Sequence, residues 1–363
     1  MKIPKLRIGD LEAEIPIIQG GMGVGVSLSG LASSVASEGG IGVISATGIG
    51  MLEPDFNANY REANKRALRR EIKRAREMTT GIIGVNILVA LTDYDDLLQI
   101  ALDEGVDLVI LGAGLPLKIP GAFFSDGDRK ITSKIVPIVS SARAARLIFR
   151  YWRTKHNRVP DAVVVEGPLA GGHLGFKKEQ IDNPEYKLEK ILPEVISVIK
   201  TYEQDFQKSI PVITAGGVYT GDDIHKFIQA GAQGVQMATR FVTTHECDAS
   251  LKFKEAYIKC RKDDLIIIDS PVGLPGRAIQ NRFLEEIASG VKKPFTCPWG
   301  CLKTCDVESS PYCICAALTN AKMGNLEKGF AFAGANAYRS DRIISVKELI
   351  HTLLMEYEKA ATA

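Results

Sequence analysis

Eight short apolar segments, spaced along the first two thirds of the chain, constrain its fold most strongly. They are rich in Val and Ile and lie at 15–19, 42–45, 83–87, 108–111, 135–139, 162–165, 211–214 and 234–237. Runs of this kind are typical of parallel strands that are buried on both faces. Amphipathic stretches lie between them, at 28–37, 55–78, 93–104, 142–154, 188–204 and 222–230. Eight repeated strand–helix units predict an α/β fold, a closed (β/α)8 TIM barrel, with a doubly wound open sheet as the alternative.

The strand–helix pattern ends near residue 246, and this predicts three parts. Residues 1–246 form the barrel. Residues 247–328 form a helical, cysteine-rich subdomain, with helices expected at 249–261, 278–289 and 314–323 and an apolar run at 266–269. Residues 329–363 return to the barrel and end in a closing amphipathic helix at 346–358.

Charge and composition limit the expected partners and compartment. The formal net charge is +2 and no basic stripe stands out, so a nucleic-acid partner is not expected. The longest uncharged apolar stretch, 81–91, is too short to span a bilayer, and residues 1–10 lack the apolar core of a signal peptide. Seven cysteines, five of them between Cys297 and Cys315, favour reduced thiols over a disulfide scaffold. We therefore expect a cytoplasmic protein with a small-molecule substrate and no membrane partner.

The sixth apolar run leads into a loop of small residues that contains one histidine. Residues 166–175 read Glu-Gly-Pro-Leu-Ala-Gly-Gly-His-Leu-Gly, so His173 follows shortly after a predicted buried strand. Loops at the C-terminal ends of barrel strands build the active sites of (β/α)8 enzymes. An imidazole titrates near neutrality and can act there as a general acid or base. The alternative is that His173 only forms a hydrogen bond within the loop.

Three other strand ends carry glycine or small residues. The first strand is followed by Gln19-Gly-Gly-Met-Gly-Val-Gly25, which is not a dinucleotide fingerprint and is equally well explained by a tight turn. The seventh and eighth strands are followed by Thr214-Ala-Gly-Gly-Val218 and Met237-Ala-Thr-Arg240. Barrels commonly bind phosphate at these two positions. The candidate phosphate-binding residues are Gly216, Gly217, Ala238 and Thr239, with ordinary barrel turns as the alternative.

In this order, the segments resemble the nitronate monooxygenase (formerly 2-nitropropane dioxygenase) flavoproteins, relatives of the FMN-dependent enoyl-acyl-carrier-protein reductases. The matching motifs are P-I-I-Q-G-G-M-G at 16–23, G-V-N at 84–86, E-G-P-L-A-G-G-H-L-G at 166–175, P-V-I-T-A-G-G-V at 211–218, M-A-T-R-F at 237–241 and S-P-V-G-L-P-G-R-A at 270–278. The resemblance covers most of the chain and implies a barrel with FMN at the C-terminal ends of its strands. It implies flavin contacts at Gly21, Met22, Asn86, Glu166, Gly172, Gly217, Ala238 and Thr239, and a catalytic role for His173.

The residue types agree with these implied roles. The Asn86 amide ends a strand, where it could contact the edge of the flavin ring, although a strand-end cap is the alternative. The Glu166 carboxylate could accept a hydrogen bond from a ribityl hydroxyl. One departure concerns the fifth strand, where some family members carry a lysine. This chain has Ser140 and Ser141 there instead.

The resemblance implies oxidation of alkyl nitronates or nitroalkanes with O2 to a carbonyl compound and nitrite. In that reaction His173 would abstract the α-proton of a nitroalkane or stabilise an anionic nitronate, and FMN would transfer the electrons. One alternative is an FMN-dependent NAD(P)H enoyl-thioester (enoyl-ACP) reductase. Another is a non-catalytic flavin or metal redox sensor. A homodimer is expected by analogy alone.

Five clustered cysteines lie outside the general pattern of this family. Cys297, Cys301 and Cys305 are four residues apart, and Cys313 and Cys315 follow. This C-x3-C-x3-C spacing is not a standard zinc or iron–sulfur pattern. Free thiols, with no metal, are therefore expected. A metal or iron–sulfur site at Cys297, Cys301, Cys305 and Cys313 is the alternative.

Overall fold

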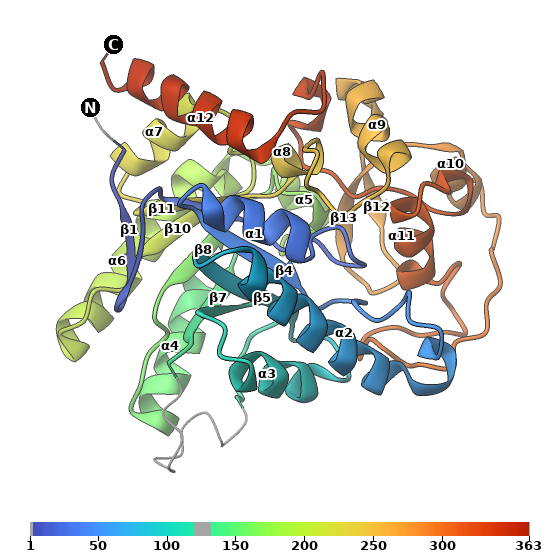
Figure 1. The fold of residues 1–363 in the computed structure, drawn as a ribbon, viewed down its shortest axis with the longest axis horizontal. Helices are drawn as coiled ribbons and strands as arrows, with labels where there is room; N and C mark the ends of the chain where they lie inside the picture. The colour runs from blue at the N-terminus through green and yellow to red at the C-terminus, as the bar shows by residue number, and fades with distance from the viewer. Residues whose placement is uncertain (1–2, 120–131, 363) are drawn as a thin grey trace.

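The computed structural model describes residues 3–119 and 132–362, and a barrel lies at its centre (Figure 1). Eight parallel strands close in the order β10-β11-β3-β4-β5-β6-β7-β8, and β8 pairs with β10 to complete the ring. They are β3 (Ile17–Gln19), β4 (Ile41–Ser45), β5 (Ile82–Leu88), β6 (Leu108–Gly112), β7 (Lys134–Val139), β8 (Val163–Glu166), β10 (Val212–Ala215) and β11 (Gly234–Met237). Each predicted apolar run is a barrel strand, so the TIM barrel is confirmed and the open-sheet alternative is wrong.

Helices that follow the strands cover the outside of the barrel (Figure 1). They are α1 (Ser29–Ser37), α2 (Phe56–Met78), α3 (Tyr94–Asp103), α4 (Ala142–His156), α6 (Leu188–Phe206), α7 (Gly221–Gln229) and the short α8 (Thr239–Val242). The closing helix α12 (Val346–Ala360) lies beside α7, where the Gly221 N–H donates to the Glu356 carboxylate at 2.7 Å. Within the described residues, none of the helices combines the length and apolarity that crossing a bilayer requires.

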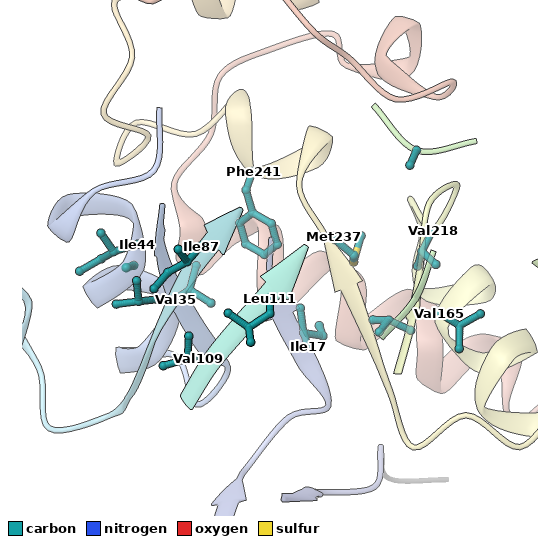
Figure 2. Packing of buried hydrophobic residues seen from close by; sticks show 14 of the residues in the cluster. Ile17, Val35, Ile44, Ile87, Val109, Leu111, Val165, Val218, Met237 and Phe241 are labelled. Carbon is teal, nitrogen blue, oxygen red and sulfur yellow. The ribbon is translucent and has the colours of Figure 1, made fainter. Parts of the chain in front are cut away.

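Alternate residues of the strands belong to two separate apolar clusters, as the two-residue period of a strand requires. One cluster joins strand residues across the barrel: Ile18, Val43, Ile110, Val136, Val164 and Ile213. Their sequence neighbours belong to a second cluster shared with the surrounding helices, and Figure 2 labels Ile17, Ile44, Val109 and Val165 among them. The barrel interior is therefore filled with side chains, and ligands are confined to its ends.

A small antiparallel hairpin, β1 (Leu6–Ile8) and β2 (Leu11–Ala13), covers the end where the strands begin. Its buried Leu6 and Ala13 side chains join the inner cluster. The turn residue Asp10 forms an ion pair with Lys134, the first residue of β7. The hairpin is absent from the predictions above.

The segment after the barrel contains a sheet as well as helices. Its elements are α9 (Leu251–Lys259), β12 (Leu265–Asp269), β13 (Pro275–Ile279), α10 (Arg282–Ala288) and α11 (Ile314–Lys322). The helix expected at 278–289 begins only at Arg282, because residues up to Ile279 extend alongside β12 as β13. β13 also pairs with β9 (Gly172–His173), which belongs to the loop after β8. The division at residue 246 stays a prediction, and this sheet joins the segments on its two sides.

Candidate functional site

The predicted site residues lie at the C-terminal ends of the barrel strands. Asn86 lies near the end of β5 and pairs with Ser45, the last residue of β4. Glu166 ends β8 and pairs with Ala215, the last residue of β10. The Gly20 N–H donates to the Met237 carbonyl at 2.8 Å, which joins the loop after β3 to the end of β11. The loops that carry the candidate residues therefore meet at one end of the barrel.

Gly21 lies directly against Asn86. A Cβ on Gly21 would lie closer than 3.0 Å to the Asn86 Cβ, so a larger residue would displace that side chain. Asn86 is 6% exposed and donates from Nδ2 to the Ile110 carbonyl at 3.3 Å. This hydrogen bond is the kind of strand-end contact that the sequence offered as the alternative to a flavin contact for Asn86. The neighbouring Met22 donates its N–H to Ser27 Oγ at 2.8 Å, which holds the loop closed on itself.

Three further polar side chains at this end of the barrel each have a buried oxygen atom that is unpaired within the described residues. Within the described chain, Ser45 Oγ, Thr47 Oγ1 and Gln236 Oε1 have no hydrogen-bond partner. Buried polar atoms are rarely left unpaired in proteins. Ser45 ends β4, Thr47 follows two residues later, and Gln236 lies in β11. These positions fit a polar ligand held over the strand ends. The sequence does not predict these three residues as site residues, because nothing but their place near a strand end distinguishes them from other serines, threonines and glutamines.

Glu166 is half-buried, and no described residue offers its carboxylate a hydrogen bond or a cation. Burial raises the pKa of this carboxyl to about 7. A carboxyl group without a partner is disfavoured in its charged form, because it loses hydration that nothing replaces. Glu166 can therefore bind a hydroxyl group either as an acceptor or as a donor.

The two candidate phosphate loops are in contact with the residues that follow Phe332. Gly216 and Gly217 have φ values of 84° and 99°, in the left-handed region that favours glycine. The Gly217 carbonyl accepts from Asn336 Nδ2 at 2.7 Å, and Thr239 Oγ1 accepts from the Gly334 N–H at 3.0 Å. Ala238 precedes α8 directly. The structure thus brings these residues to one side of the barrel end, with the Thr239 hydroxyl already accepting one hydrogen bond.

His173 is presented by β9 and is held by a residue from the segment after the barrel. Its Nε2 lies 2.7 Å from Ser270 Oγ, a partner 97 residues further along the chain. The Phe332 ring meets the imidazole edge-on, with 5.0 Å between ring centroids. Burial lowers the pKa of His173 to about 4, so its imidazole is neutral at pH 7. Gly172, with a φ of 76°, allows the turn that delivers it.

Ser270 and Arg277 were not predicted as site residues. Arg277 Nη1 donates to the carbonyls of Pro168 and Ala170 at 2.6 and 2.8 Å, which fixes the loop before His173. Burial lowers the pKa of this guanidinium. Both residues lie in the motif S-P-V-G-L-P-G-R-A, so the sequence did contain a signal for them.

The two serines after the fifth barrel strand have different roles. A Cβ on Gly175 would lie closer than 3.0 Å to Ser140 Oγ, so Ser140 lies against the histidine loop. Ser141 instead caps α4, where its side chain accepts from the Ala144 N–H at 3.2 Å. Of the two, only Ser140 lies against the loop that carries His173.

The clustered cysteines lie beside the loop that follows β5. All five are free thiols, and Cys301 Sγ lies 3.6 Å from Cys315 Sγ. The backbone of Lys303 donates to the Ala90 carbonyl at 2.9 Å, and the Thr92 N–H donates to the Cys301 carbonyl at 3.1 Å. Among the residues whose structure is described, no group of three or more His, Cys, Asp or Glu side chains is arranged to hold a metal ion.

Comparisons with known proteins identify relatives over almost the whole chain. A family model described as nitronate monooxygenase matches residues 6–356. A "probable nitronate monooxygenase" of Staphylococcus aureus (strain Newman) is 30% identical over 304 residues, which cover 77% of this chain and 79% of the relative. FabK from Thermotoga maritima superposes with a TM-score of 0.72 at 27% identity, covering 96% of this chain and 94% of its own. A nitroalkane oxidase from Streptomyces ansochromogenes, with a TM-score of 0.73 and coverage of 96% and 97%, shares 23% identity and shows the fold alone.

Proposed function

The chain belongs to the nitronate monooxygenase family, and on that basis we propose that it is an FMN-dependent oxidoreductase acting on alkyl nitronates or nitroalkanes. Its products with O2 would be a carbonyl compound and nitrite. The observation that carries this proposal is the set of unpaired buried atoms of Ser45, Thr47 and Gln236 at the same barrel end as His173. A protein without a polar ligand there would leave these atoms uncompensated.

FMN fits the residues at this end of the barrel. Gly21 packs closely against Asn86 with no side chain of its own, so the flavin ring could approach the backbone there, with Met22 beside it. Glu166 and Gly172 would hold the ribityl chain, and the Glu166 carboxyl has no competing partner within the described residues. The phosphate would be bound by four small residues: Gly216, Gly217, Ala238 and Thr239. When bound, FMN supplies the transfer of electrons from substrate to O2.

His173 is the residue proposed to contact the substrate. Its imidazole is neutral at pH 7 and its ring stands beside Phe332, so it offers one nitrogen donor or acceptor next to an apolar side chain. We predict that His173→Ala retains bound FMN and loses at least about 10²-fold in turnover, the loss typical of a general base or an oxyanion donor. Flavin absorbance and O2 consumption measure the two effects. Full turnover in this variant would remove His173 from the mechanism.

A second candidate is an FMN-dependent NAD(P)H enoyl-thioester reductase. The half-buried Phe332 ring, which meets the His173 imidazole edge-on, favours it because it offers an apolar contact to an acyl chain. Anaerobic addition of propyl-2-nitronate or NADPH in separate cuvettes distinguishes the two functions. Bleaching of the flavin band by nitronate alone supports the monooxygenase, and bleaching by NADPH alone supports the reductase. A protein that binds no flavin after reconstitution with FMN would contradict both.

A non-catalytic redox sensor is a third candidate, suggested by the five clustered thiols. The contact of this segment with the loop after β5 is the route by which thiol chemistry would reach Asn86. Blocking the thiols should then change flavin binding. If flavin content and turnover stay unchanged, and metal analysis finds neither iron nor zinc, the sensor is excluded.

A further inference from the structure

Two of the five clustered cysteines, Cys301 and Cys315, have thiols in direct contact. Their Sγ atoms lie 3.6 Å apart. In the described part of the chain they are the only two thiols that form a hydrogen bond with each other. A disulfide joins its sulfur atoms at about 2.0 Å, so these two need to approach by about 1.6 Å to form one. That distance is on the scale of side-chain rotation.

Separate contacts with the barrel bring the two thiols together. Cys301 lies against the loop after β5, where its carbonyl accepts from the Thr92 N–H at 3.1 Å. Cys315 is 7% exposed and lies in the first turn of α11. In the next turn of that helix, the Thr319 hydroxyl contacts Met51 Sδ, in the loop after β4, at 3.0 Å. The contact between the thiols is therefore a product of the fold, and not of a local turn.

The two thiols differ in acidity and in exposure. The hydrogen bond with Cys315 lowers the pKa of Cys301, and burial and the Asp93 carboxylate oppose this effect without cancelling it. The same hydrogen bond, together with burial, raises the pKa of Cys315. Cys301 is half-buried, whereas Cys315 is buried. Because the thiolate is the nucleophilic form of cysteine, Cys301 is the thiol that meets an oxidant first, and Cys315 is its partner.

From the contact between these thiols we propose that Cys301 and Cys315 are a redox-active pair that hydrogen peroxide oxidises to a disulfide. First, the Cys301 thiolate attacks one peroxide oxygen, the O–O bond breaks, hydroxide leaves, and Cys301 becomes a sulfenic acid. Then the Cys315 sulfur attacks the Cys301 sulfur, the S–O bond breaks, and the oxygen leaves with the Cys315 proton as water. The proton that Cys301 lost on ionisation neutralises the hydroxide. The dithiol thus gives up two electrons, and the peroxide is reduced to two molecules of water.

The neighbouring thiols are less suited to this chemistry. Burial raises the pKa of Cys313 to about 11, and it also raises the pKa of Cys305. Cys305 Sγ lies 3.9 Å from Ser310 Oγ, so its partner is a hydroxyl group. The pair is separate from the candidate flavin site. It therefore does not depend on the proposed oxidoreductase function, and it does not require the chain to be a non-catalytic sensor.

Peptide mapping of the full-length protein, as purified, tests the pairing. The reduced protein is treated with a stoichiometric amount of hydrogen peroxide and alkylated, and trypsin then cleaves after Lys303, between the two cysteines. We expect one disulfide, between Cys301 and Cys315, and recovery of both thiols with dithiothreitol. The bridge should be absent from Cys301→Ser and Cys315→Ser and present in the matched control Cys313→Ser. A wild-type bridge to another cysteine, or no bridge, would overturn the proposal.

Trapping with dimedone, which labels sulfenic acids, tests the order of the two steps. In Cys315→Ser the serine hydroxyl can still donate to Cys301, so oxidation should stop at a Cys301 sulfenic acid. In Cys301→Ser, labelling of Cys315 should be at least about tenfold slower, because this thiol stays protonated. Circular dichroism reports whether the variants are folded, and the wild-type map decides the pairing without them. Equal labelling of the two cysteines would contradict the assignment of Cys301 as the nucleophile.

Elemental analysis of the same preparations separates this proposal from a metal site. Wild-type protein without bound zinc or iron supports a free dithiol. Zinc or iron that is bound to wild type and lost from both serine variants would make the two sulfurs metal ligands, and the proposal would be wrong.

Discussion

Glu166 should make the stability of the flavin-free protein depend on pH in a direction unusual for a carboxyl group. Burial without a partner raises its pKa from the ordinary 4.5 to about 7. The folded protein therefore binds this proton more tightly than the unfolded chain does. The stabilisation is complete below pH 4.5 and is lost as the pH rises through 7.

The size of the effect follows from the separation of the two pKa values. Each pH unit between them corresponds to about 1.4 kcal/mol, so the contribution of Glu166 to the free energy of unfolding should fall by about 3 kcal/mol between pH 4.5 and pH 8. Glutamine has a similar shape and does not ionise. Glu166→Gln should therefore match wild type near pH 4.5 and exceed its stability by up to about 3 kcal/mol at pH 8.

Urea unfolding of the flavin-free proteins, followed by circular dichroism at pH 4.5, 6 and 8, measures this difference. Glu179→Gln, at an exposed position in the short helix Lys178–Ile181, is the matched control and should track wild type throughout. Added FMN should reduce the difference at pH 8, because a ribityl hydroxyl would give the carboxylate a partner. If the difference between Glu166→Gln and wild type is the same at all three pH values, the carboxyl is not desolvated as described.

Three other substitutions or titrations test the site. Gly21→Ala should destabilise the protein by about 1–3 kcal/mol and lower its flavin content, because the new Cβ would overlap that of Asn86. The flavin-to-protein absorbance ratio measures the flavin content, and full FMN occupancy would contradict the close contact. Arg277→Met removes the hydrogen bonds to the Pro168 and Ala170 carbonyls and should lower the free energy of unfolding by about 2–3 kcal/mol. Urea unfolding at pH 7 checks it, and wild-type stability would show that the loop is held by other contacts. The His173 ring resonance in NMR should not move between pH 5.5 and 8, because its pKa lies at about 4; a midpoint near 6.5 would show that the ring is solvated.

The barrel is predictable because each strand carries its own local signal. Runs such as the one at 108–111 are apolar at every position, which is what a strand covered on both faces requires. The β1–β2 hairpin also has a local signal, an alternation of apolar and polar residues around Gly9-Asp10. β13 is different, because Pro275 and Gly276 indicate a turn when only neighbouring residues are considered. Its strand conformation depends on β12 and on β9, a long-range pairing that no local pattern reveals.

The residues of the candidate site also fall into two groups: those that the local sequence predicts, and those whose roles depend on contacts made in the folded chain. Asn86 and Glu166 stand at strand ends and His173 lies in the loop after β8, so position and resemblance are enough to predict them as candidates. Ser270 and Arg277 act on the histidine loop from a segment about a hundred residues away, so their roles follow only from the folded contacts. The environments of Glu166 and His173 also require the fold, because desolvation depends on what surrounds a group and not on its neighbours in sequence.

The pairing of β9 with β13 also determines when the site is completed during synthesis. The eighth barrel strand ends at Met237, and Ser270 and Arg277 leave the ribosome only after it. Chains fold from the N-terminus as they emerge. A nascent barrel can therefore assemble all its strands while the loop that carries His173 still lacks its partner strand. A chain that ends before β13 would therefore be a barrel whose His173 loop lacks the contacts of Ser270 and Arg277.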